Sequence, residues 1–167
     1  MSHTCPPARY PTLSMLVGGG IALTVTLLTR LWVGSPLNLI HTLEAFLTIP
    51  PLWIMGVLWL TTFALLGAAA GALLAAPCGN PEREVHLWRG STFMVLAMVS
   101  SLVWYALLFG KQLLLPSCLC LLPALSASLL CALSWKRIHL LAAIPPLLFG
   151  LWQLTLLLLQ ISVLFHI

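Results

Sequence analysis

Residues 90–110 read GSTFMVLAMVSSLVWYALLFG and contain no Asp, Glu, Lys or Arg. Three other runs, 45–81, 112–135 and 138–167, also lack charged residues, and 13–29 forms a further apolar stretch. Because roughly 20 apolar residues of α-helix match a hydrocarbon core of about 30 Å, each run is long enough to cross a bilayer. The expected spans lie near 13–33, 51–76, 90–110, 112–135 and 138–164.

Composition supports a single membrane domain. Of the 167 residues, 61% are hydrophobic and 6% are charged, which is too little charge to cover a soluble globule. In lipid the backbone amides must pair within the chain, and continuous Leu-rich, Ala-rich and Gly-rich runs do so as helices, whereas barrel strands alternate. The sequence therefore predicts an all-α integral membrane protein, a bundle of five transmembrane helices over residues 1–167.

The distribution of the basic residues predicts the orientation of the chain in the membrane. The formal net charge is +4, with seven Lys and Arg against three acids. Such an excess could indicate a nucleic-acid partner in a soluble protein, but here no nucleic acid is expected. Arg30 and Lys111 fall on one side of the expected bundle, and the positive-inside rule puts the N-terminus in the cytoplasm. The cations on the other side are Arg9, Arg83, Arg89, Lys136 and Arg137.

Connections between the spans carry some structural signals. Residues 34–50 mix polar and apolar side chains with helical spacing, and we expect this connector to form an amphipathic lid over one end of the bundle. The short turn at Lys111 predicts that the third and fourth spans are antiparallel neighbours.

Two further signals predict local irregularities. The charged run from Glu82 to Glu84 follows a turn signal and is expected in a solvated loop. Pro145 and Pro146 fall inside the last expected span, where they should kink the helix.

The residues offer no catalytic or metal site. All three glutamates fall in expected loops, which argues against a transporter or pump that needs a buried titrating acid. There is no HExxH, Walker or GxSxG motif. Of the five cysteines, Cys118, Cys120 and Cys131 lie within one span, and we interpret them as packing residues.

Seven tryptophans are the most informative side chains. Three lie near basic residues at expected span ends, where a belt at the membrane interface explains them: Trp32, Trp88 and Trp135. An indole N–H in lipid needs a partner, which favours the bundle interior for the other four. They either pack the core or line a ligand pocket: Trp53, Trp59, Trp104 and Trp152.

Residues 49–59, IPPLWIMGVLW, followed by Phe63 and Gly67, resemble the second-helix signature of the tryptophan-rich sensory protein/translocator protein (peripheral benzodiazepine receptor) family. Trp104 followed by Phe109-Gly110 is similar to the end of that family's third helix. The start of the family's fifth helix is similar to the pattern formed by Trp135, Leu141-Ala142-Ala143 and Trp152. The resemblance covers roughly residues 49–160 and all of the blocks occur in order.

The chain departs from the family pattern at several polar positions. Ser101 stands where the family has Asn, Leu148 and Phe149 stand near its Pro-Tyr, and Gln160 stands in place of a late Asn. The Tyr and Arg of the family's C-terminal sterol-associated motif are absent.

The resemblance implies a membrane receptor or carrier for flat hydrophobic ligands such as porphyrins, haem-like tetrapyrroles or sterols, held inside the bundle. It implies no required cofactor, and an enzymatic role only as light-driven porphyrin breakdown. The apolar pocket residues expected are Trp53, Trp59, Phe63, Trp104, Phe149 and Trp152. Ser101 and Gln160 are the expected polar anchors, with His41 or Glu44 in the lid.

A structural or assembly protein is the alternative. Small residues let membrane helices approach closely, so such faces could dock partner proteins or a second copy in a homodimer. The residues concerned are Gly18 to Gly20, Gly67, Ala68, Gly71 and Ala72. We expect a multi-pass protein of the bacterial cytoplasmic membrane, with the mitochondrial outer membrane as the alternative.

Overall fold

The computed structural model describes residues 11–33, 52–75 and 80–165, and the expected lid at 34–50 lies outside these ranges. Within them all regular structure is helical, as predicted. The helices are α1 (Pro11–Val33), α3 (Leu52–Ala75), α4 (Pro81–Tyr105), α5 (Leu114–Lys136) and α6 (Ile144–Leu164). A π-helical turn, η1 (Ala106–Gly110), continues α4, and a 3₁₀ turn, η2 (Leu140–Ala143), precedes α6.

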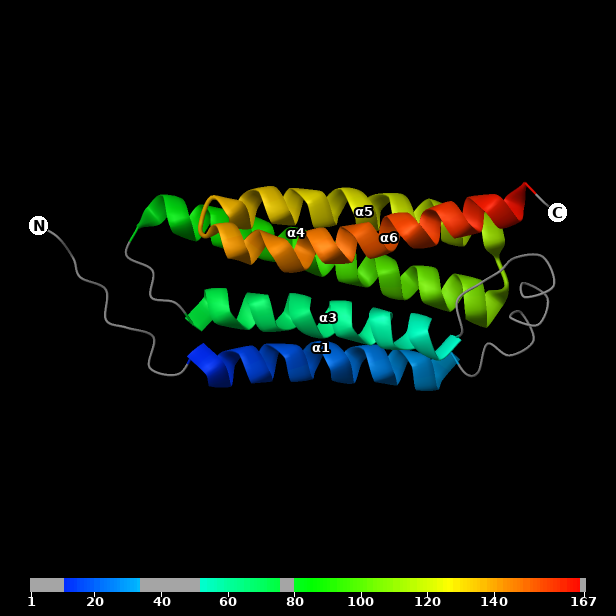
Figure 1. Ribbon diagram of the computed structural model, residues 1–167, viewed down its shortest axis with the longest axis horizontal. Coiled ribbons are helices and arrows are strands. Elements are labelled where there is room, and N and C mark those ends of the chain that lie inside the picture. The colour runs from blue at the N-terminus through cyan, green and yellow to red at the C-terminus, as the bar shows by residue number, and fades with distance from the viewer. Residues whose placement is uncertain (1–10, 34–51, 76–79, 166–167) are drawn as a thin grey trace, which may run out of the picture.

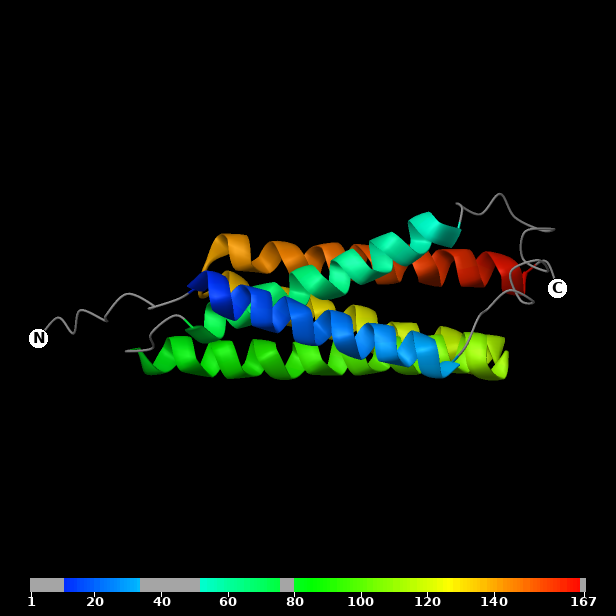
Figure 2. The same ribbon diagram turned by 90° about the horizontal axis from the view of Figure 1, so that it is seen from below.

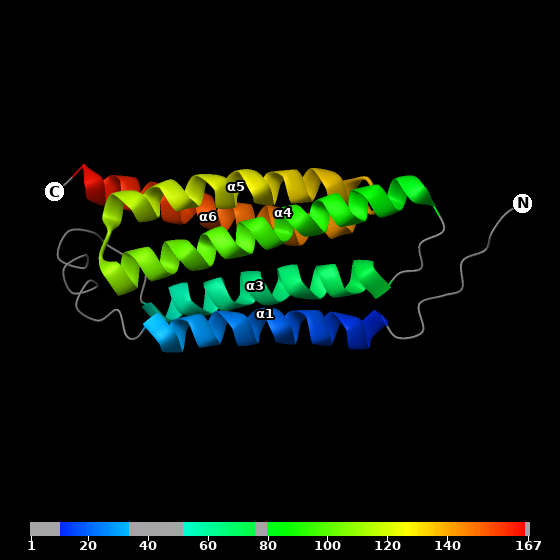
Figure 3. The same cartoon turned by 180° about the vertical axis from the view of Figure 1, so that it is seen from behind.

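The helices form an elongated bundle in which α1 and α3 lie side by side and α4, α5 and α6 form the remainder (Figure 1). Helix α3 contacts both α1 and α6, and α5 contacts both α4 and α6. Figure 2 shows α3 running obliquely, so that its start lies away from α1 and towards α6. Seen from behind, α4 and α5 are adjacent, as the short turn at Lys111 predicted (Figure 3).

The outer surface is that of a membrane protein. Five described helical segments are long and apolar enough to cross a bilayer. Large apolar side chains cover the outside, among them Leu16, which is 73% exposed, and Leu31, which is 79% exposed. Since exposed leucines of this density are stable only against lipid, the chain is a multi-pass membrane protein, as predicted.

The third span begins earlier than expected. Helix α4 starts at Pro81, and Asn80 caps it by accepting a hydrogen bond of 3.0 Å from the Glu82 amide. Glu82 and Glu84 are therefore in the first helical turn and not in a loop. Their negative charges favour the positive end of the helix dipole there, and proline is tolerated because first-turn amides lack internal partners.

Pro145 and Pro146 also lie at a helix start. They occupy the first turn of α6, because η2 supplies the preceding turn of the span. The prolines therefore do not lie inside the α-helix, where we expected them, but mark the change from the 3₁₀ turn to α6, where a first-turn proline removes no internal hydrogen bond.

Trp135 does not face the outside of the bundle, as a residue of an aromatic belt would. Its side chain is fully buried, whereas Trp32 is 84% and Trp88 is 65% exposed, as expected of an aromatic belt. Gly90 of α4 makes the room, because a Cβ there would lie 2.3 Å from Trp135 Cδ1. The prediction failed at Trp135 because the basic residues that follow it mark the end of the helix but not the direction in which the indole points.

Glycines bring α1 and α3 into backbone contact. A Cβ on Gly67 would lie 2.4 Å from the Gly18 carbonyl oxygen, and one on Gly71 would lie 2.0 Å from the Ser14 carbonyl oxygen. Gly19 of α1 faces Ala64 and Ala68 of α3, whereas Gly20 faces open space. The small-residue faces that the alternative function would use on a partner are thus largely occupied within the chain.

We predict that Gly67→Ala destabilises the bundle by about 1–3 kcal/mol, because the new methyl group forces two backbones apart. Thermal unfolding of the detergent-solubilised protein measures the effect. Gly20→Ala is the matched control and should be neutral or slightly stabilising, since nothing lies within 4 Å of the added atom. Equal melting temperatures for the two variants would contradict this packing.

Candidate functional site

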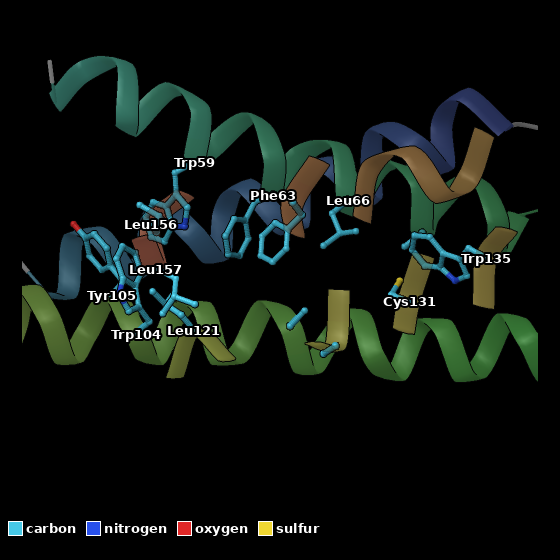
Figure 4. Packing of buried hydrophobic residues seen from close by; sticks show 14 of the residues in the cluster. Trp59, Phe63, Leu66, Trp104, Tyr105, Leu121, Cys131, Trp135, Leu156 and Leu157 are labelled. Carbon is cyan, nitrogen blue, oxygen red and sulfur yellow. The ribbon is translucent and has the colours of Figure 1, made fainter. Parts of the chain in front are cut away.

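Aromatic side chains gather at one end of the buried core. The rings of Trp59 on α3 and Tyr105 on α4 are stacked, with centroids 4.6 Å apart and an interplanar angle of 19°. Tyr105 also contacts Phe109 at 4.8 Å, and Phe109 contacts Trp104 at 6.0 Å. Figure 4 shows Trp59, Trp104 and Tyr105 together at one end of the cluster, with Trp135 at the other.

A cavity of about 80 Å³ opens beside these rings. It lies towards the ends of α1 and η1 and the start of α3, as the chain positions of its residues show. Its lining is mainly aromatic and comes from α1, α3, α4, η1 and α6: Arg30, Met55, Gly56, Trp59, Trp104, Tyr105, Phe109, Trp152 and Leu156. Since pockets for drug-sized ligands are about 300–1,000 Å³, a large ligand requires some of these side chains to move.

Three predicted site residues, Trp59, Trp104 and Trp152, line this cavity. Phe63 and Phe149 do not line it but lie fully buried behind it. Phe63 packs edge-on against Trp59 at 5.4 Å and against Phe149 at 5.1 Å. These two phenylalanines therefore support the cavity wall and leave contact with a ligand to the tryptophans.

The two predicted polar anchors bond to other parts of the bundle. Ser101 accepts a hydrogen bond of 2.9 Å from Gln153 Nε2. Gln160 Oε1 accepts one of 2.8 Å from the Trp104 indole, and Gln160 Nε2 donates to the Leu114 carbonyl at 2.8 Å and to Ser117 Oγ. Neither side chain lines the cavity, and both connect helices to one another.

The remaining predicted residues cannot be placed at the site. His41 and Glu44 lie outside the described residues, and Trp53 is in the first turn of α3 with its side chain outside them.

Two of the cavity's indoles have unpaired donors. The Nε1 atoms of Trp59 and Trp152 are buried and have no hydrogen-bond partner in the described part of the chain. A buried polar group without a partner is unfavourable by about 1–3 kcal/mol, so such donors usually meet a ligand, a water or another side chain in the functional state. The Trp104 donor differs, because Gln160 accepts it.

Arg30 is the one cation among the lining residues. It lies in the last turn of α1, and its Nη1 atom would be 3.4 Å from a Cβ at Gly56. The guanidinium therefore lies close to the start of α3.

Sequence reasoning missed several lining residues, notably Arg30, Gly56, Tyr105 and Leu156. Tyr105 could have been found, because it lies four residues before Phe109, the spacing that places two side chains on one helical face. No sequence signal indicated that Arg30 would reach the tryptophans, because that contact joins two helices.

The backbone is irregular beside the cavity. Residues Ala106–Gly110 form a π-helical turn, a feature frequent at functional sites. The turn to α5 follows at once, and Gln112 there has a φ of 55°. The irregular backbone ends the regular pairing of α4 just after Tyr105.

No group of three or more His, Cys, Asp or Glu side chains in the described ranges could hold a metal ion. Comparisons of the chain with protein-family models, with curated proteins and with solved structures found no match.

We predict that Gln160→Leu destabilises the protein by about 1–3 kcal/mol, because it leaves the Trp104 indole donor unpaired in an apolar interior, whereas the Leu114 carbonyl keeps its hydrogen bond from Ser117 Oγ. Thermal unfolding in detergent measures the loss. Thr155→Val is the control on the same helix: Thr155 is exposed and bonds only to its own helix at Leu151, so the change should stay within about 0.5 kcal/mol. A Gln160→Leu protein as stable as this control would refute the proposed role of Gln160.

Proposed function

We propose that the protein is a membrane receptor or carrier for a flat apolar ligand, which binds in the aromatic cavity between α3, α4 and α6. One observation carries the proposal. Aromatic rings from three separate helices, Trp59, Trp104 with Tyr105, and Trp152, meet at one cavity. Such rings offer broad faces for stacking and few rotatable bonds to immobilise.

Stacking and hydrogen bonding must supply the selectivity. A ligand that arrives from the bilayer is already out of water, so apolar burial distinguishes it little from a lipid tail. A flat ring instead gains from the offset-stacked geometry that aromatic pairs prefer, worth about 0.5–1.5 kcal/mol for each pair. The Trp59–Tyr105 stack has this geometry within the protein.

Tyr105 would then occupy the place of a ligand ring. Its side chain covers one face of Trp59, and the adjoining cavity is only about 80 Å³. Rotation of Tyr105 away from Trp59 would uncover that face. The π-helical turn that begins at the next residue supports this movement, because the regular helical pairing ends there.

The sequence resemblance supports porphyrins, related tetrapyrroles or sterols as the ligand class. The three tryptophans that line the cavity are among the residues that carry the resemblance to the translocator protein family. The positive-inside rule supports an orientation in which the start of α1 faces the cytoplasm, because Arg83, Arg89 and Lys136 lie at that end. The cavity would then lie towards the opposite face of the membrane.

Titration of the detergent-solubilised protein with protoporphyrin IX tests the proposal. We expect saturable quenching of tryptophan fluorescence, and Trp152→Phe should weaken binding about three- to tenfold because it removes an indole face and donor. Trp88→Phe is the matched control, since Trp88 is exposed and outside the cavity. Quenching that does not saturate, or that the two variants change equally, would count against the pocket.

Tyr105→Ala should open the space beside Trp59 and tighten or accelerate protoporphyrin binding about fivefold, because the ligand no longer displaces a stacked ring. Tyr105→Phe keeps that ring and should bind like the unchanged protein. Stopped-flow fluorescence separates the association rate from the dissociation rate. If Tyr105→Ala instead weakens binding, Tyr105 contacts the bound ligand and does not block the face of Trp59.

A further inference from the structure

We infer that the cavity selects a ligand that carries a carboxylate beside its flat apolar body, and that Arg30 binds this acid. The inference rests on the proposed function and adds the ligand's charge and the residue that recognises it. It distinguishes anionic ligands from neutral ones of the same shape, such as esters and alcohols.

The hydrogen-bonding character of the cavity is the first argument. The unpaired buried groups that line it are donors, namely the indole N–H groups of Trp59 and Trp152. Arg30 adds a guanidinium, which has five donors and no acceptor. A carboxylate has only acceptors when ionised, and a guanidinium can bind it through two parallel hydrogen bonds. The donor set therefore matches an acid better than a hydroxyl group.

Charge balance is the second argument. No acidic side chain lines the cavity, and no salt bridge to Arg30 occurs among the described residues. The acids in those ranges, Glu82 and Glu84, lie in the first turn of α4, whereas the cavity is beside its last turn. The Arg30 side chain is exposed at the edge of the cavity and is therefore accessible to an anionic group of a ligand, which would supply the counter-ion.

The position of Arg30 is the third argument. A cation in the last turn of a helix is also stabilised by the helix dipole, which explains a basic residue there without any ligand. The dipole does not explain why the side chain reaches across to α3. Nη1 lies near Gly56, and Arg30 lines the same cavity as Trp59 and Trp152, the two lining residues with unpaired buried donors.

A matched pair of probes tests the charge: protoporphyrin IX, a dicarboxylic acid, and its uncharged dimethyl ester. Both are titrated into the full-length protein in a neutral detergent. We expect the acid to bind at least about tenfold more tightly than the ester, because hydrogen bonds between charged groups are stronger than those between neutral groups. Arg30→Gln should remove this difference by weakening only the acid, and Arg30→Lys should restore part of it.

Two controls make the test specific. Lys111→Gln removes a cation at the same end of the bundle that does not line the cavity, and should leave both affinities unchanged. Unchanged ester binding by Arg30→Gln shows that this variant is folded and that its aromatic site is intact.

Failure of this inference differs from failure of the proposed function. If the unchanged protein binds acid and ester equally and Arg30→Gln alters neither, the inference is overturned while the aromatic site stands. If neither probe binds saturably, the proposed function fails as well. Glu44→Gln adds a further check of whether Arg30 pairs with an acid of its own chain. If Glu44→Gln and Arg30→Gln destabilise the ligand-free protein equally and both leave acid binding unchanged, Arg30 forms such an ion pair. The inference is then overturned.

Discussion

A hydrocarbon interior supplies no hydrogen-bond partner, so buried polar groups must bond to one another. Gln160 makes such hydrogen bonds to two neighbouring helices. Its amide oxygen accepts from Trp104 on α4, and its nitrogen donates to Leu114 and Ser117 on α5, while Gln160 itself belongs to α6. One side chain therefore holds three helices in register. Between lipid-like surfaces such directional contacts, together with close packing, replace the hydrophobic force that holds soluble bundles together.

The same contact distinguishes the three tryptophans of the cavity. Trp104 is held by Gln160 and cannot rotate without breaking a buried hydrogen bond. Trp59 and Trp152 have no such partner within residues 11–33, 52–75 and 80–165. Among the described residues the cavity therefore combines one indole that a hydrogen bond holds with two that are held by packing.

The two ends of the bundle differ because α3 is oblique. At the glycine contacts with α1, Gly67 and Gly71 allow the two backbones to meet, and the groove of about 660 Å³ beside them is lined by aliphatic side chains of α1, α3 and α4 and not by aromatic rings. Towards its start, α3 diverges from α1 and approaches α6 (Figure 2). Large rings fill the wider gap that results, and Arg30 reaches over it. Close contact at one end and aromatic filling at the other follow from a single crossing of two helices.

The sequence predictions that failed were those that depend on the direction in which a side chain points. Basic neighbours correctly marked the end of the helix at Trp135, but Gly90 on another helix decided that the indole would point inward. Likewise Ser101 and Gln160 were predicted as polar anchors for a ligand, but they bond to Gln153, to Trp104 and to α5, and neither lines the cavity.

The sequence by itself determined the number of spans, their approximate limits and the helical fold, because in lipid a run of apolar residues has only one common way to pair its amides. It also indicated that Trp59, Trp104 and Trp152 lie inside the bundle, since indoles away from the interface need an interior. Only the tertiary structure decided that Tyr105 covers Trp59, that Gln160 is already bonded and that Arg30 lines the same cavity as the tryptophans. Each of these depends on the rotation and crossing of helices distant in the chain, which are set by packing between helices and not by the composition of any one of them.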